Sequence, residues 1–256
     1  MIKNIIIKGL LYLFFPLYLY PQQVDSSLFY YNKAEKSYNK FDNYSALKYY
    51  IKAYKFDSTN YDVAWKLSRT YVDVGEIKKN KNERKIFYQK GLKYAIKATE
   101  INSEGAKGYL SCSIAVGRVA LDAGKKEQVK LSKEVKNYVD KSIELDPSDD
   151  IAWHVLGRWN RKMATLGWVQ RKFANIFLGG LPKDASVDNA VTCFKKAIEI
   201  NPNSIRHHLE LGITYEKQKE KELARVEYKR ALELPIQDSD DSELKKEAKK
   251  RLNDIE

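Results

Sequence analysis

The side chains of this chain whose type and spacing could do chemistry are mostly basic. Arginine, lysine and histidine bind carboxylate and phosphate groups, and a nearby tryptophan adds a stacking surface. Counted from the start of each predicted helix pair, nine such residues would face one hollow: Trp65, Arg69, Lys107, Arg118, His154, Arg158, Arg161, Lys162 and Arg206. Asp62 and Asp73 fall at equivalent positions. Two explanations stay open, a groove for acidic ligands or a chain that is lysine-rich throughout.

The densest part of this set lies on one predicted helix. His154, Arg158 and Arg161 are separated by four and then three residues, so they share one helical face. Lys107 and Arg118 would sit on the neighbouring helix and face the same hollow. Like charges this close repel one another unless solvent or a bound anion screens them, which favours an acidic ligand.

Catalytic chemistry has no comparable signal. The sequence contains no zinc-protease, serine-hydrolase, P-loop or dinucleotide-binding motif, so we expect no enzyme activity, no cofactor and no metal site. His207 and His208 are adjacent on a predicted helix and point in different directions, which predicts a partly exposed pair. Cys112 and Cys193 belong to different repeats, so buried free thiols are expected rather than a disulfide.

Three tryptophans could form an aromatic ligand box. Trp153, Trp159 and Trp168 lie close together in the sequence. Trp153 falls on a core position of its repeat, and packing is the more common role of aromatic residues at helical spacing. The sequence therefore predicts that all three pack inside the protein.

The composition restricts the elements that can carry these side chains. The chain has 256 residues, a net charge of +12, 43% hydrophobic and 31% charged residues, which fits a folded globular protein. Twelve glycines and six prolines are few for an all-β protein, which needs frequent turn residues. An all-α fold is predicted.

A phrase that ends a helix recurs five times. In each copy a small residue follows a bulkier or apolar residue three positions earlier, and an Asp-Pro or Asn-Pro pair stops the helix in two copies. The copies are KYYIKAYKFDSTN ending at Asn60, KYAIKATEINSEG ending at Gly105, NYVDKSIELDPSDD ending at Asp150, CFKKAIEINPNS ending at Ser204 and EYKRALELP ending at Pro235.

A second amphipathic stretch precedes each phrase, with Leu156-Gly157 and Leu211-Gly212 as the clearest examples. This arrangement resembles the tetratricopeptide repeat (TPR), in which small residues let two helices, A and B, pack closely. The first repeat departs from the pattern, with Lys33 at the usual Leu position and Ser58 at the usual Pro. We predict five TPR-like repeats over residues 27–238.

The spacing between the phrases predicts longer hairpins in the middle of the chain. The small residues Ala53, Ala98, Ser142, Ala197 and Ala231 are 45, 44, 55 and 34 positions apart, and only the last spacing equals the standard period. We expect the second and third repeats to have elongated hairpins, with the extra residues shared between both helices. The third would run over 106–121 and return over 127–145.

The largest spacing leaves room for an additional helix. The insert in the fourth repeat predicts a helix over about 167–178, with Ser186 capping the helix that follows. The polar residues 239–256 predict a C-terminal helix that caps the stack.

The N-terminal residues 1–26 have the pattern of a secretory signal peptide. Lys3 and Lys8 precede an apolar run over 9–20, and this run is too short to span a bilayer. We expect export, with a periplasmic location in a Gram-negative host. The alternative is that an uncleaved segment anchors the protein to a membrane.

A more specific resemblance covers roughly residues 90 to 236. The phrase WHVLGRW over 153–159, the stretch from Leu166 to Asn203 and the closing ALELP are similar to the regulator of microtubule dynamics family. The resemblance implies a helical-repeat domain. In that family, members are linked to microtubules and, in one branch, to membrane contact sites and phospholipid handling.

These observations favour a non-catalytic scaffold that binds an acidic protein or peptide in its concave groove. The alternative is a protein that binds an anionic phospholipid or tethers a membrane through the same basic groove. Nucleic acid is not expected as a partner, because only the net charge supports it.

Overall fold

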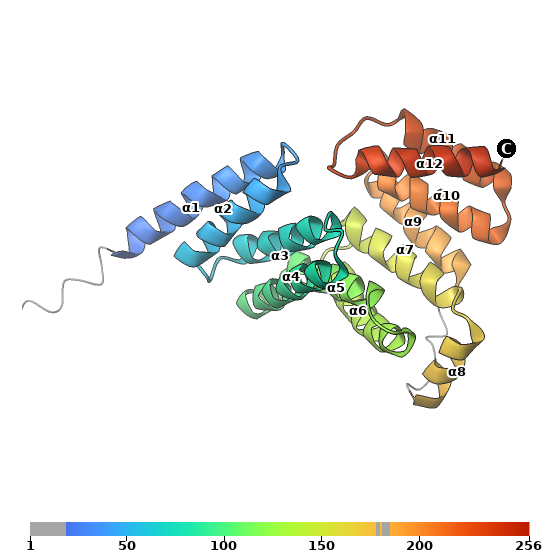
Figure 1. Cartoon of the computed structure of the whole chain (residues 1–256), viewed down its shortest axis with the longest axis horizontal. Helices are drawn as coiled ribbons and strands as arrows, with labels where there is room; N and C mark the ends of the chain where they lie inside the picture. Colours follow the sequence, from blue (N-terminus) through green and yellow to red (C-terminus); the bar gives the residue numbers. More distant parts are fainter. Residues whose placement is uncertain (1–18, 178–179, 181–184, 256) are drawn as a thin grey trace, which may run out of the picture.

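The computed structural model describes residues 19–177, 180 and 185–255, and every regular element in these ranges is an α-helix (Figure 1). The all-α prediction is confirmed. No helix in the described ranges is both long and apolar enough to cross a membrane. The helices are α1 (Leu19–Tyr38), α2 (Asn43–Phe56), α3 (Tyr61–Glu76), α4 (Lys81–Ile101), α5 (Ala106–Leu121), α6 (Lys125–Leu145), α7 (Asp150–Ala164), α8 (Trp168–Phe177), α9 (Val187–Ile200), α10 (Ile205–Gln218), α11 (Lys221–Glu233) and α12 (Asp241–Ile255).

The described helices pack as a row of hairpins. The pairs are α1 with α2, α3 with α4, α5 with α6, α7 with α9 and α10 with α11, and α12 closes the row against α10 and α11. The row curves, with α1 and α2 at one end, α10 to α12 at the other, and α5 and α6 below and between them in the view of Figure 1. Most of the predicted signal peptide lies outside the described residues, and its last part, 19–26, forms the start of α1.

The predicted elongation is present, but it is divided unequally. The B helices α4 and α6 have 21 residues each, whereas the A helices α3 and α5 have 16 and the final pair α10 and α11 has 14 and 13. Most of the additional length therefore lies in the B helices. Helix α6 also begins at Lys125 rather than at the predicted Glu127, because Gly124 already has the extended backbone of an N-cap.

Side-chain caps begin several of these helices. Asn60 accepts a hydrogen bond from the backbone N–H of Val63, and Asp149 accepts one from that of Ile151. Ser186 caps α9 as predicted, by accepting a bond from the backbone N–H of Asn189 at 3.0 Å. Each cap satisfies a donor that the first helical turn leaves without a partner.

A glycine on helix A packs directly against an aromatic ring on helix B in three of the hairpins. A Cβ on Gly75 would lie 2.7 Å from the Tyr88 ring, one on Gly157 would lie 2.9 Å from the Phe194 ring, and one on Gly212 would overlap the Tyr228 ring. Phe194, rather than the small Ala190 or Ala197 of the same helix, lies against Gly157. These rings are buried, so they have little freedom to move away.

We predict that Gly157→Leu lowers the free energy of unfolding by about 1 to 3 kcal/mol, because the new side chain overpacks the contact with Phe194. The matched control is Gly117→Leu on α5. A Cβ at Gly117 would have only Val135 within 4 Å, at 3.8 Å. Chemical denaturation of both variants measures the difference, and equal stability of the two variants would contradict this packing.

Candidate ligand-binding groove

A cavity of about 440 Å³ lies between the A helices α3, α5, α7 and α10 and the B helix α6. Its floor is apolar and includes Ile114, Val135, Val155 and Met163. Seven of the nine predicted site residues line it: Arg69, Arg118, His154, Arg158, Arg161, Lys162 and Arg206. The cavity therefore combines an apolar floor with a strongly cationic wall.

The other two predicted residues lie away from this cavity. The indole N–H of Trp65 donates to Asp62 at 3.0 Å. The ammonium group of Lys107 pairs with Asp149 at 2.8 Å, at the turn between α6 and α7. Both interactions are local to the helix ends, so the structure does not bring Trp65 or Lys107 together with the other seven.

Glu210 on α10 holds two of the cavity's arginines. Its carboxylate pairs with the guanidinium groups of Arg158, at 3.3 Å, and Arg161. Arg161 also donates to the backbone carbonyl of Glu210 at 2.8 Å and to the Thr214 hydroxyl at 3.0 Å. Burial raises the pKa of Glu210, but the two guanidinium groups outweigh this effect and hold the pKa below its ordinary value. Glu210 is thus ionised and fixes Arg161 in place.

Positive charge remains in excess beside Glu210. Lys162 has no ion pair within the described residues, and burial together with the charge of Arg158 lowers its pKa. Arg118 pairs with Glu76, yet its buried Nε has no hydrogen-bond partner in the described part of the chain. Burial lowers the pKa of Arg118, and the nearby Arg158 and Arg206 lower it further. This part of the cavity would be stabilised by an added anion.

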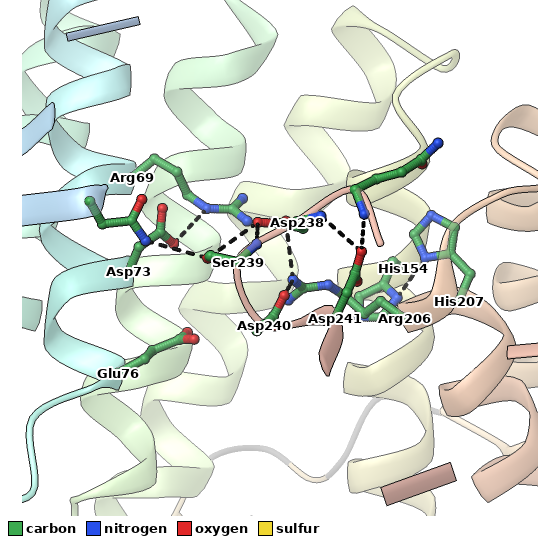
Figure 2. A network of polar contacts seen from close by, with 12 residues as sticks. Arg69, Asp73, Glu76, His154, Arg206, His207, Asp238, Ser239, Asp240 and Asp241 are labelled. Atoms are coloured by element: carbon green, nitrogen blue, oxygen red, sulfur yellow. Dashed lines mark hydrogen bonds and ion pairs between the residues drawn. The ribbon is translucent and has the colours of Figure 1, made fainter. Parts of the chain in front are cut away.

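An acidic loop crosses from the C-terminal end of the row to its N-terminal end. This α11–α12 loop, residues 234–240, places Asp238 and Asp240 at 3.4 and 2.7 Å from the Arg206 guanidinium (Figure 2). Its Ser239 hydroxyl accepts a hydrogen bond from the Asn43 amide of α2 at 3.4 Å. The Asp241 carboxylate fixes the loop by accepting bonds from the backbone N–H groups of Gln237 and Asp238.

The loop borders a second hollow of about 290 Å³ that shares Arg69, Arg118 and Arg206 with the first. Asp73 pairs with Arg69 there, and the Tyr38 hydroxyl donates to the same carboxylate. The groove is therefore cationic near α7 and mixed in charge near α3 and the α11–α12 loop. Sequence reasoning missed the acidic residues of the loop and Glu210, since no local pattern marks partners this far apart in the chain.

The histidine prediction was wrong, because His207 and His208 are both buried. His207 lies between two groups. Its Nε2 is 2.9 Å from the Asp150 carboxylate. Its Nδ1 is 3.0 Å from Nδ1 of His154 (Figure 2). His208 contacts the Glu227 carboxylate at 2.6 Å. These polar contacts join α7 to α10 and α10 to α11, so the histidines connect neighbouring helices.

Cys112 and Cys193 are buried free thiols, as predicted. Burial raises the pKa of Cys112 to about 12 and that of Cys193 to about 11, so both stay protonated at neutral pH.

The tryptophan prediction holds in part. Trp159 is buried and donates its indole N–H to the Ser132 carbonyl at 2.7 Å, whereas Trp153 is half-buried. Trp168 is 74% exposed, so its predicted packing was wrong.

We predict that stability falls as the pH drops from about 7 to about 5. Burial, and then the nearby His207 and arginines, hold the pKa of His154 well below 6.5. As the pH falls, His154 takes up a proton in the unfolded chain before it does so in the folded protein. The stability that neutral His154 contributes is therefore complete above the pKa of the unfolded chain. It is lost below that pKa, by up to about 1.4 kcal/mol per pH unit. Denaturation at several pH values should give a shallower dependence for His154→Gln. Identical slopes for this variant and the wild type would contradict the assignment.

Comparison with known proteins identifies the family. The model for "Regulator of microtubule dynamics protein 1-3" matches residues 30–256. Bovine regulator of microtubule dynamics protein 1 is 28% identical over 194 residues, which cover 75% of this chain and 61% of the relative. The protein 1 of Caenorhabditis elegans is also 28% identical, over 75% of this chain and 84% of its own length. The chain spans about three fifths of the length of the bovine relative.

A solved structure supports the same fold. A thermophilic TPR protein of Thermus thermophilus superposes with a TM-score of 0.65 at 16% sequence identity, covering 89% of this chain and 99% of that one. This likeness confirms the predicted fold, a TPR-like stack of helical hairpins. With the family match over residues 30–256, the chain belongs to the regulator of microtubule dynamics protein 1-3 family.

Proposed function

We propose that this protein is a non-catalytic helical-repeat scaffold that binds an acidic segment of a partner protein in the cavity between α3, α5, α7 and α10. The observation that carries the proposal is a local excess of positive charge. Arg158 and Arg161 share one carboxylate, that of Glu210, and Lys162 has no ion pair within the described residues. A carboxylate of the partner would supply the missing negative charge.

The rest of the cavity suits a peptide segment that is acidic without being wholly polar. Its floor includes Ile114, Val135 and Met163, which could receive apolar side chains of the partner. A purely electrostatic site would not need this floor. We therefore favour a segment in which acidic and apolar residues alternate.

The α11–α12 loop supports this choice of ligand. It is itself an acidic segment outside the helices, and its Asp238 and Asp240 pair with Arg206, which lines the cavity. The loop thus provides an internal example of acidic chain bound to these cations. It also withdraws Arg206 from any external ligand, so the two should compete.

An anionic phospholipid is the second candidate for the same cavity. The observation in its favour is the apolar floor beside the cations, which could receive an acyl chain while Arg158 and Lys162 bind the phosphate.

We also propose that the protein is exported to the periplasm, or that residues 1–26 stay uncleaved and anchor it to a membrane. The support for this is the apolar run over 9–20, which is followed by a folded domain.

The first test changes the positive charges beside Glu210. Reversing Arg161 would break its bonds to Glu210 and Thr214, so the sharper variant is Arg158→Gln with Lys162→Glu. We expect it to bind hexa-aspartate at least tenfold more weakly than the wild type, a loss of about 1.4 kcal/mol. Isothermal titration measures the affinity, and Lys229→Glu on the exposed surface of α11 is the control. An unchanged affinity in a variant that is folded by circular dichroism would refute the proposal.

The second test removes the ion pairs between the α11–α12 loop and Arg206. Asp238→Asn with Asp240→Asn removes both partners of Arg206, so hexa-aspartate should bind about tenfold more tightly. Asp254→Asn with Glu220→Gln makes the same change in net charge at exposed positions and should have little effect. Equal affinities for the two double variants would mean that the loop does not compete.

A further inference from the structure

Helix α8 lies outside the repeating hairpins. It is built from the insert in the fourth repeat, which makes the third spacing 55 residues, and it packs against α6 while the row continues through α7, α9 and α10. Figure 1 shows it projecting from the stack, away from α10–α12. Helix α7 pairs with α9 directly, so α8 is not part of that contact and its exposed surface is available to a partner.

The outer face of α8 carries three exposed apolar side chains. Trp168, Val169 and Ile176 have exposed fractions of 74%, 54% and 60%, whereas Ala174 is buried and Phe173 is half-buried. Trp168, Lys172 and Ile176 are four residues apart, so they lie along one face of the helix. Exposed apolar groups clustered on one helix mark an interaction surface.

The charged side chains in the sequence around α8 are all positive. Residues 151–183 contain no Asp or Glu, and Lys172 is exposed beside the apolar side chains. On the neighbouring α6, the Lys126 ammonium lies 5.4 Å from the centre of the Phe173 ring, and Lys130 follows one turn later. Arg171 is held by the carbonyls of Ala164 and Leu166, which ties α8 to the end of α7.

We propose that α8 docks on the surface of an anionic membrane, lying in the plane of the headgroups with Trp168, Val169 and Ile176 inserted. An exposed tryptophan with aliphatic neighbours and flanking lysines is the composition of an interfacial helix. The lysines of α6 and α8 would contact anionic headgroups, whose potential attracts nearby basic residues. A protein partner would have to offer an acidic surface around an apolar centre, and vesicle binding distinguishes a membrane from such a partner.

The test is flotation of the full-length chain with vesicles of phosphatidylcholine alone or phosphatidylcholine with phosphatidylserine. We expect binding to the vesicles with phosphatidylserine, and Trp168→Ser with Ile176→Ser should weaken it at least about tenfold. Leu223→Ser with Val226→Ser removes two exposed apolar side chains from α11 and is the matched control. The proposal is overturned if the α8 variant and the control bind alike, or if neither vesicle binds the wild type, which would leave α8 to a protein partner.

Quenching by brominated phospholipid identifies the inserted residue. The N-terminal residues 1–24 contain no tryptophan, so an apolar N-terminus that enters the bilayer adds no signal of its own. Trp168→Phe should remove most of the quenching seen in the wild type while vesicle binding persists. Equal quenching in both proteins would show that α8 does not insert and would overturn the proposal.

Discussion

The contact between a glycine of helix A and an aromatic ring of helix B is the constraint on which the rest of the structure depends. Gly75 with Tyr88, Gly157 with Phe194 and Gly212 with Tyr228 bring the two helices of a hairpin close together. Because buried rings are tightly packed, this contact fixes the rotation of helix A about its axis. That rotation decides which side chains of α3, α7 and α10 face the groove.

The same rotation pairs charges between neighbouring repeats. Glu210 of α10 reaches Arg158 and Arg161 of α7, and Arg206 meets the α11–α12 loop. Charges that are buried need partners, and most of the groove cations have one. The incomplete pairing beside Lys162 therefore stands out, and a ligand that supplies a carboxylate would complete it.

The hairpins could be predicted because their signals are local. A small residue near a bulky one and a closing Asn-Pro or Asp-Pro lie within one helix end, so the range of α5 and the cap at Ser186 followed from the sequence. Glu210 could not be assigned to the groove, since its contact with Arg161 joins residues 49 positions apart and depends on how the repeats curve. The exposure of Trp168 also could not be predicted, because helical spacing does not tell which face lacks a neighbour.

Native mass spectrometry of the purified full-length chain tests most directly whether the groove binds an acidic peptide segment. With hexa-aspartate and phosphatidylserine offered together, we predict a complex with one peptide per chain that is lost in Arg158→Gln with Lys162→Glu. A lipid bound to α8 would be unaffected by that variant, so the two sites are distinguishable. A discrete lipid mass that excludes the peptide and disappears in the groove variant would contradict the account.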